Sequence, residues 1–193
     1  MRVAACLMPV TLVATALLIG ACDRHSSAQE QATQQANGIA AAPVAASAAH
    51  ALDRSRKGTA APTLAFAGPD GKPTTLAAFR GKPVLLNLWA TWCGPCVKEL
   101  PTLDALAGRE AGRLQVVALS QDMQADKVAP FFVARHLATL KPYTDPKMAW
   151  VPAVTDNLPT SILYDSAGRE VWRTVGDLDW TETVALNAVR EAT

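Results

Sequence analysis

Two cysteines, Cys93 and Cys96, have the spacing that thiol chemistry requires. With two residues between them, both sulfurs can lie within bonding distance on one turn of a helix. An apolar run of strand length precedes the pair and a helical pattern follows it, so the first sulfur is predicted to lie at a helix N-terminus. Unpaired backbone N–H groups and the helix dipole favour the thiolate there, which is the nucleophilic form of cysteine. We therefore expect Cys93 to attack a substrate disulfide and Cys96 to resolve the mixed disulfide.

The residues around the pair suit contact with a substrate. Gly94 permits close approach, and Pro95 has no N–H group that would need a partner in the first turn of the helix. Trp92, directly before Cys93, is predicted at the surface, whereas Trp89, within the apolar run, is predicted to be packed. Trp92, Gly94 and Pro95 are therefore candidate substrate-binding residues.

A metal site is the main rival interpretation of a cysteine pair. Structural zinc needs four ligands, commonly two such pairs or one pair with two histidines. The histidines are His25, His50 and His136, of which the first two fall in a segment expected to be a linker. His136 is predicted to be a half-buried helix residue. We therefore expect no metal site and interpret Cys93 and Cys96 as a redox pair.

The N-terminus has the layout of an export signal. A single basic residue, Arg2, precedes the uncharged run 3–21, which ends in small residues. Residues 1–21 are predicted to be a signal peptide, and a retained transmembrane anchor is the alternative because a run of this length can span a bilayer. The segment LLIGAC, ending at Cys22, resembles the lipobox of bacterial lipoproteins. That resemblance implies lipidation of Cys22, after Cys6 has left with the signal.

The mature chain is predicted to be a tether followed by one domain. Residues 22–61 are rich in Ala, Gln and Ser and lack aromatic residues, so they cannot bury enough apolar surface to offset the entropy of ordering. We expect a flexible linker there and a folded domain over 62–193. That domain has 13 Lys and Arg and 14 Asp and Glu, and 13 minus 14 gives a formal charge of −1. This balance, without a basic stripe, argues against nucleic-acid binding.

The pattern of the domain predicts an α/β layer fold with a mixed sheet. Strands alternate with helices along its middle, and the chain finishes with a hairpin and a helix. The predicted elements are a hairpin around Pro69–Gly71, a buried strand over 84–90, a helix over 95–109, a buried strand over 114–120, a helix over 126–137, an extended segment near Tyr143, an irregular stretch over 145–157, a hairpin over 159–175 turning at Asp165–Gly168, and a closing helix begun by Asp179 or Thr181. The tryptophans Trp150, Trp172 and Trp180 are predicted in the core or at an interface.

The active-site stretch also resembles a known family. The sequence WCGPC, Trp92 to Cys96, resembles the active site of the thioredoxin superfamily, and NLWATWCGPCVKELP is similar to its exported TlpA/ResA-type branch. The similarity covers about residues 62–193. It implies a thioredoxin-like fold, with a central mixed β-sheet flanked by helices, an N-terminal β-hairpin and an insertion over 121–156.

The resemblance adds site residues that lie far from the cysteines in the sequence. Pro159, in NLPTSILYD, matches the cis-proline that lies against the cysteine pair and helps to bind the substrate backbone, with Leu158 beside it. Where thioredoxin carries a buried aspartate, this chain has Asn87, which cannot relay a proton. The resemblance places that role on Glu99, three residues past Cys96 and so on the same helix face. Burial would raise its pKa, and an exposed surface glutamate is the alternative.

The resemblance implies a thiol:disulfide oxidoreductase that uses no cofactor. Gly-Pro between the cysteines is the dipeptide of reducing thioredoxins, so we expect reduction of exported protein disulfides. The implied partners are a membrane thiol donor of the DsbD or CcdA type and apocytochrome c as a client. We expect a monomer, lipid-anchored on the periplasmic side of the bacterial cell membrane. The alternatives are a copper- or zinc-binding chaperone of the same fold and a thiol oxidase, although Sco-type copper proteins have three residues between their cysteines.

Overall fold

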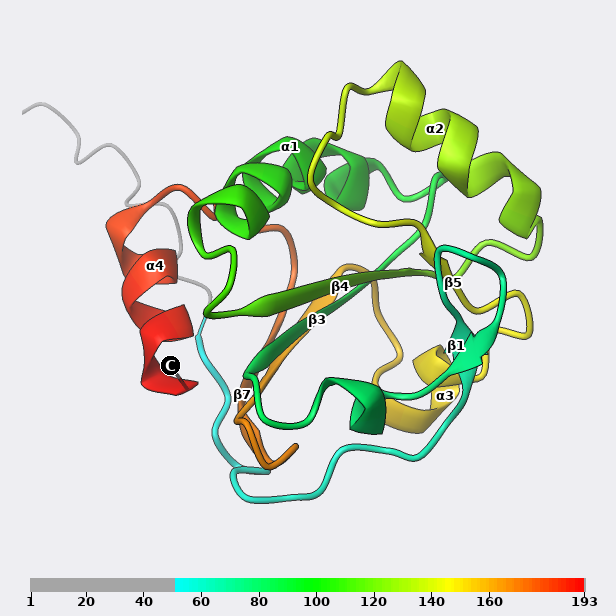
Figure 1. Ribbon diagram of the computed structural model, residues 1–193. Helices are drawn as coiled ribbons and strands as arrows, with labels where there is room; N and C mark the ends of the chain where they lie inside the picture. The colour runs from blue at the N-terminus through cyan, green and yellow to red at the C-terminus, as the bar shows by residue number, and fades with distance from the viewer. Residues whose placement is uncertain (1–50, 193) are drawn as a thin grey trace, which may run out of the picture. The chain divides into compact units, whose positions relative to one another are not determined.

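The computed structural model describes residues 51–192 (Figure 1). The expectations for the N-terminal segment concern residues outside this range, namely the signal peptide 1–21, the lipidation site Cys22, the linker up to residue 50, and the histidines His25 and His50. Among the described residues, no helix combines the length and the apolar character that crossing a membrane requires.

Within residues 51–192 the strands form one mixed sheet in the order β2-β1-β5-β4-β3-β6-β7. The strands are β1 (Phe66–Ala67), β2 (Pro73–Thr74), β3 (Val84–Trp89), β4 (Gln115–Ser120), β5 (Tyr143–Thr144), β6 (Thr160–Tyr164) and β7 (Glu170–Val175). β3 runs parallel to β4 and antiparallel to β6. All six residues of β3 are buried, as expected for a strand that is covered on both faces. The predicted mixed sheet is confirmed.

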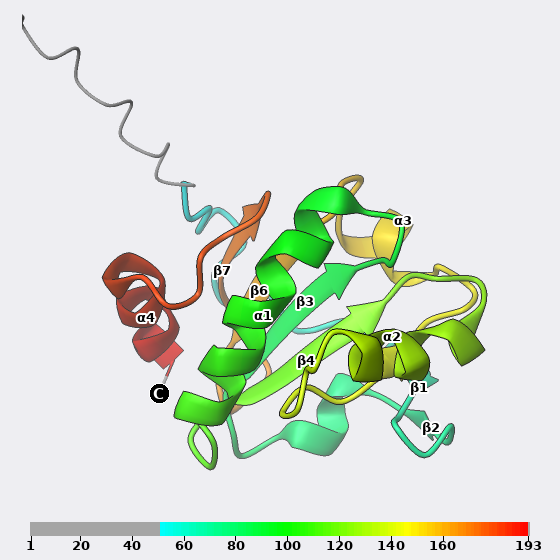
Figure 2. The same cartoon turned by 90° about the horizontal axis from the view of Figure 1, so that it is seen from above.

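Helices cover both faces of the sheet (Figures 1 and 2). They are α1 (Gly94–Arg109), α2 (Val128–Ala134), α3 (Trp150–Val154) and α4 (Thr183–Val189), with the short 3₁₀ helices η1 (Leu76–Phe79), η2 (Ala125–Lys127) and η3 (Arg190–Ala192). Side chains of α1, α2 and α4 share a core cluster with Leu85 and Trp89, whereas η1 and α3 share a second cluster with Leu86 and Leu88. Because side chains alternate along a strand, Asn87 lies on the face that α1 covers.

The segment before β1 pairs with the outer edge of β7. Asp53 exchanges two backbone hydrogen bonds with Arg173 (2.8 and 2.9 Å), and Ala60 forms an isolated bridge with Arg169. Composition predicts a flexible linker here, but the structure places residues 53–61 against the sheet. The pairing uses backbone groups that an edge strand leaves free, and composition does not reveal such pairing.

The helix predicted over 126–137 is shorter and divided. η2 leads into α2, which ends at Ala134. His136, expected to be a half-buried helix residue, lies beyond the end of the helix, is exposed and has a φ of 55°. Its N–H donates to the carbonyl of Val133 (3.1 Å) as the chain turns away. The prediction was wrong over the last turn because apolar spacing does not show where a residue adopts the left-handed conformation.

Two predictions for the second half also need correction. The stretch after β5, expected to be irregular, contains α3, where the Trp150 N–H donates to the side chain of Asp145 (2.9 Å). The closing helix begins at Thr183, with Glu182 as its N-cap. Asp179 and Thr181, predicted to begin it, form a turn before the helix, in which Asp179 Oδ1 accepts the Thr181 N–H (2.9 Å). The two central strands and α1 agree with their predicted bounds to within one residue.

Candidate active site

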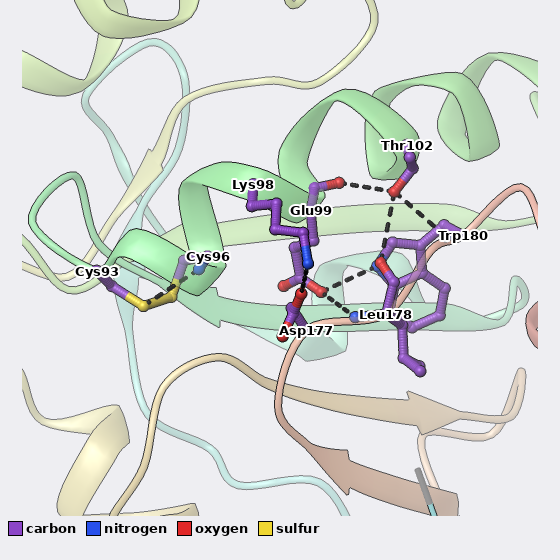
Figure 3. Close-up of polar contacts among 8 residues, drawn as sticks. All are labelled: Cys93, Cys96, Lys98, Glu99, Thr102, Asp177, Leu178 and Trp180. Carbon is purple, nitrogen blue, oxygen red and sulfur yellow. Dashed lines mark hydrogen bonds and ion pairs between the residues drawn. A yellow bond between two sulfur atoms is a disulfide. The ribbon is translucent and has the colours of Figure 1, made fainter. Parts of the chain in front are cut away.

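Cys93 and Cys96 lie where β3 leads into α1, and their sulfurs form a disulfide (Figure 3). Cys93 is the N-cap of the helix, with an extended backbone (φ −89°, ψ 102°), and its Sγ accepts the Cys96 N–H (3.3 Å). Once the disulfide is reduced, the N-terminal N–H groups and the dipole of a 16-residue helix stabilise negative charge on the first sulfur. The predicted placement of the pair is therefore the observed one.

The two sulfurs differ in how far a substrate can reach them. Cys93 is 7% exposed, whereas Cys96 is 0% exposed. Gly94 and Pro95 are exposed beside them, and Trp92 is 65% exposed. Cys93 is accordingly the more accessible of the two sulfurs, and the residues predicted at the surface around it are there.

Pro159 lies at the same end of the central strands as the loop that carries the cysteines. The Leu158–Pro159 peptide bond is cis. Thr160, the next residue, pairs with Leu88 near the end of β3. Pro159 is buried, and Leu158 is half-buried against both core clusters. The sheet register thus brings these residues and Cys93 to the same end of the central strands, although they are far apart in the sequence.

A buried aspartate holds the loop that leads into the cysteine pair. Asp122 accepts the Thr91 N–H (3.0 Å), the Thr91 hydroxyl (2.7 Å) and the Ser120 hydroxyl (2.7 Å). Thr91 is two residues before Cys93, so these contacts fix the start of the loop. Sequence reasoning missed Asp122, although an acidic residue two positions after a buried strand is a usable signal.

Glu99 lies three residues past Cys96 on α1 and is buried, at 2% exposure. Its Oε1 accepts the side-chain Nδ2–H of Asn87 (2.7 Å). Its Oε2 accepts the backbone N–H of Leu178 (3.0 Å) and the indole N–H of Trp180 (3.3 Å), as Figure 3 shows. The carboxylate therefore meets three N–H donors from two separate segments of the chain, β3 and the segment that follows β7. The alternative of an exposed surface glutamate is wrong.

Burial raises the pKa of Glu99 to about 7, because removal from water disfavours the charged form. The three N–H donors act in the opposite direction, and the charge of Asp177 raises the pKa further. Asp177 lies close by because its Oδ2 pairs with Lys98 Nζ (2.9 Å) at the surface (Figure 3). Glu99 can consequently gain or lose a proton near neutral pH.

Sequence reasoning missed the partners of Glu99. The sequence identifies Asn87 only as a residue that replaces an acid, and it predicts Trp180 only in the core or at an interface. Their contacts depend on sheet register and on the path of the chain after β7, which local spacing does not encode. Among residues 51–192, no three His, Cys, Asp or Glu side chains are grouped so that they could hold a metal ion.

Comparisons with known proteins agree with this geometry. The chain matches the Redoxin family over residues 56–189, more than half of its 193 residues. Thiol-disulfide oxidoreductase ResA of Bacillus thuringiensis (strain Al Hakam) is 32% identical over 123 residues, which span 62% of this chain and 70% of that protein. A Chlorobium tepidum protein provisionally named thiol:disulfide interchange protein DsbE has a TM-score of 0.61 and 28% identity, covering 70% of this chain and 96% of that one. The exposed lipoprotein thioredoxin Etrx1 of Streptococcus pneumoniae strain TIGR4 has a TM-score of 0.56 and 26% identity, over 66% and 98% of the two chains.

The sheet, the disulfide at the N-terminus of α1 and these similarities point the same way. The predicted thioredoxin-like fold is confirmed. The chain belongs to the Redoxin family and is a thiol:disulfide oxidoreductase of the thioredoxin superfamily.

Proposed function

We propose that this protein is a membrane-tethered enzyme that reduces the disulfides of exported proteins through Cys93 and Cys96. The observation that carries the proposal is the position of Cys93 Sγ at the N-terminus of α1, where it accepts the Cys96 N–H (3.3 Å). A thiolate in that position is stabilised before the substrate arrives. The Gly-Pro dipeptide between the cysteines, typical of reducing thioredoxins, favours reduction over thiol oxidation.

The cycle begins with the reduced pair. The Cys93 thiolate attacks one sulfur of the substrate disulfide, forms a mixed disulfide and releases the other substrate sulfur as a thiolate. Cys96 then loses its proton and attacks Cys93 Sγ, so that the Cys93–Cys96 disulfide forms and the second substrate sulfur leaves. Two electrons pass to the substrate, and its two sulfurs take up two protons in place of those that the cysteines released. A membrane dithiol donor of the DsbD or CcdA type would return two electrons and two protons to the pair.

Glu99 is the proposed proton acceptor for Cys96. It lies three residues later on α1, and residues at that spacing share a helix face. Its pKa of about 7 supports this role, because a group that titrates near the working pH can both accept and release a proton. The burial of Cys96 adds support, since water has little access to that thiol.

Five residues at the same edge of the sheet are proposed to bind the substrate. Trp92, Gly94 and Pro95 are exposed around Cys93 and offer an apolar surface next to the reacting sulfur. Leu158 and Pro159 lie at the start of β6, where an extended substrate backbone could run beside them.

The location is proposed from residues outside the described range. A signal peptide over 1–21, lipidation of Cys22 and a linker from residue 22 would hold the domain on the periplasmic side of the cell membrane. The description of the similar Etrx1 as an exposed lipoprotein supports the lipid anchor, and an N-terminal transmembrane segment is the alternative. Apocytochrome c is proposed as a client because it is common in the TlpA/ResA-type branch that the sequence resembles.

Equilibration of the full-length protein with a thiol–disulfide buffer tests the direction of the reaction. We expect a reduction potential near that of thioredoxin, roughly −270 mV, and a value near roughly −120 mV would indicate an oxidant instead. Insulin reduction with dithiothreitol as the donor tests turnover, which Cys93→Ser should abolish. An inactive wild type, or full activity in Cys93→Ser, would contradict the proposal. Stoichiometric zinc or copper in the purified protein would favour a metal chaperone.

A further inference from the structure

The two oxygens of Glu99 face partners of different kinds. Oε2 accepts the Leu178 backbone N–H and the Trp180 indole N–H, and neither of these groups has an atom that can accept a hydrogen bond in return. Oε1 faces Asn87, whose side-chain amide carries both a donor, Nδ2, and an acceptor, Oδ1. A proton on Oε2 would point at an N–H group, so a protonated Glu99 must carry its proton on Oε1.

The amide of Asn87 is arranged to serve the ionised carboxylate. Nδ2 donates to Glu99 Oε1 (2.7 Å) and to Ser161 Oγ (3.0 Å). Oδ1 is buried and has no hydrogen-bond partner among the described residues. When Oε1 carries a proton, the same arrangement sets two donors against each other, which is unfavourable in a buried site.

We propose that Asn87 is a positioning residue whose side-chain amide inverts when Glu99 is protonated, so that Oδ1 replaces Nδ2 opposite Glu99 Oε1. In the inverted state, Oδ1 accepts the Glu99 O–H and also the Ser161 hydroxyl, which can donate as well as accept. Its place in the redox cycle rests on the proposed role of Glu99 as the proton acceptor for Cys96. The inversion moves no proton to or from Asn87, and it supports whichever state Glu99 adopts.

Without the effect of the proton on Glu99, the two orientations of the Asn87 amide are similar in free energy. In one of them Oδ1 lacks a partner, and in the other Nδ2 does, so each leaves a single buried polar atom unpaired. The proton on Oε1 therefore decides between them. An aspartate at this position could not act in this way, because its two oxygens are alike and it carries a charge of its own.

Charged groups near Glu99 influence its pKa, so a test of the inversion should leave them unchanged. Asp177, in the segment after β7, raises the pKa of Glu99, and Lys98 on α1 pairs with Asp177. A cavity of about 500 Å³ lies beside Glu99, and Asp179 and Glu182 are among the residues that line it. β3 and β6 contribute the uncharged Asn87 and Ser161. Substitutions of these two uncharged residues therefore leave the local charge unchanged.

NMR on the oxidised full-length protein tests the inversion, because the cysteines do not titrate in the disulfide. The spectra are compared about two pH units above and below the Glu99 pKa of about 7. We expect a nuclear Overhauser effect between the Asn87 Nδ2 protons and the Ser161 β-protons above that pKa. This effect should disappear below the pKa. The pH at which it is half lost should equal the midpoint of the Glu99 carboxyl carbon chemical shift in a pH titration.

Glu99→Gln mimics the protonated state of Glu99 at every pH, because its side chain is uncharged and does not titrate. Its amide oxygen can accept from Leu178 and Trp180, which turns its NH₂ group toward Asn87 and requires Oδ1 there. The Asn87 pattern in this variant should match the low-pH wild type at every pH. An Asn87 amide that keeps one orientation while Glu99 titrates would overturn the inversion and leave the proton-acceptor role standing. A Glu99 with one protonation state throughout would overturn both.

Asn87→Ala provides a second measurement. Loss of the amide removes a charge-assisted hydrogen bond from the ionised form and a neutral one from the protonated form. Because the charge-assisted bond is the stronger of the two, the midpoint for Glu99 should move upward by about half a pH unit, roughly a threefold change in its protonation equilibrium. Asn157→Ala removes an exposed asparagine and is the matched control, with no change in the midpoint expected. A well-folded Asn87→Ala protein whose midpoint moves downward would contradict the proposal, and an upward shift of about two pH units or more would indicate a fixed donor that serves the ionised form alone.

Discussion

Replacement of Glu99 by glutamine should change how the stability of the oxidised protein depends on pH. Burial raises the pKa of Glu99 from 4.5 to about 7, so the folded protein binds this proton more tightly than the unfolded chain does. The free energy of unfolding contributed by Glu99 therefore falls as pH rises from about 4.5 to about 7 and is level outside that window. At about 1.4 kcal/mol per pH unit, the fall is about 3 kcal/mol.

Urea denaturation of wild type and Glu99→Gln at several pH values measures this contribution. The stability of wild type minus that of the variant should drop by about 3 kcal/mol between pH 4.5 and 7, because the variant has no proton to lose there. Glu182→Gln, at an exposed glutamate beside the same cavity, is the matched control, and its difference from wild type should stay constant. A difference for Glu99→Gln that is equally constant would refute the assignment of a raised pKa to this carboxyl.

Three further outcomes are expected. Cys96→Ser should stop the cycle at the mixed disulfide, since the resolving sulfur is gone, and a covalent adduct with a disulfide substrate should appear on a non-reducing gel. Asp122→Ala should lower the free energy of unfolding by about 3 kcal/mol, because Thr91 loses two hydrogen bonds to a buried carboxylate. Urea denaturation measures this loss, and a change below about 0.5 kcal/mol would show that Asp122 does not hold the loop. Trp180→Phe keeps an aromatic side chain at this position but removes one N–H donor, so the pKa of Glu99 should rise by about half a unit or more in a carboxyl NMR titration, and a fall would contradict the contact.

Local sequence patterns predicted the parts of the site that lie within one turn of structure. The positions of Cys93 and Cys96 followed from a buried strand that precedes a helix. The face of Glu99 followed from its spacing to Cys96 along that helix. The cis bond before Pro159 followed only from the family resemblance, because the cis form is a minority state for any X-Pro bond.

The rest of the site depends on contacts between distant segments. Asn87 is 12 residues from Glu99 in the sequence, and Trp180 is 81 residues away, yet both donate to its carboxylate. The edge pairing of Asp53 with Arg173 uses backbone groups alone, so nothing in the composition of the linker indicates it. These contacts were not predictable because they follow from register and chain path.

The pKa of the Cys93 thiol in the reduced full-length protein tests the central claim most directly. The rate of alkylation by iodoacetamide, followed against pH with the site of modification identified by mass spectrometry, measures that pKa. Because Cys93 Sγ lies at the N-terminus of α1 and accepts the Cys96 N–H, we expect a value at least about one pH unit below the value of about 8.5 for free cysteine. A value at or above that of free cysteine would contradict the account.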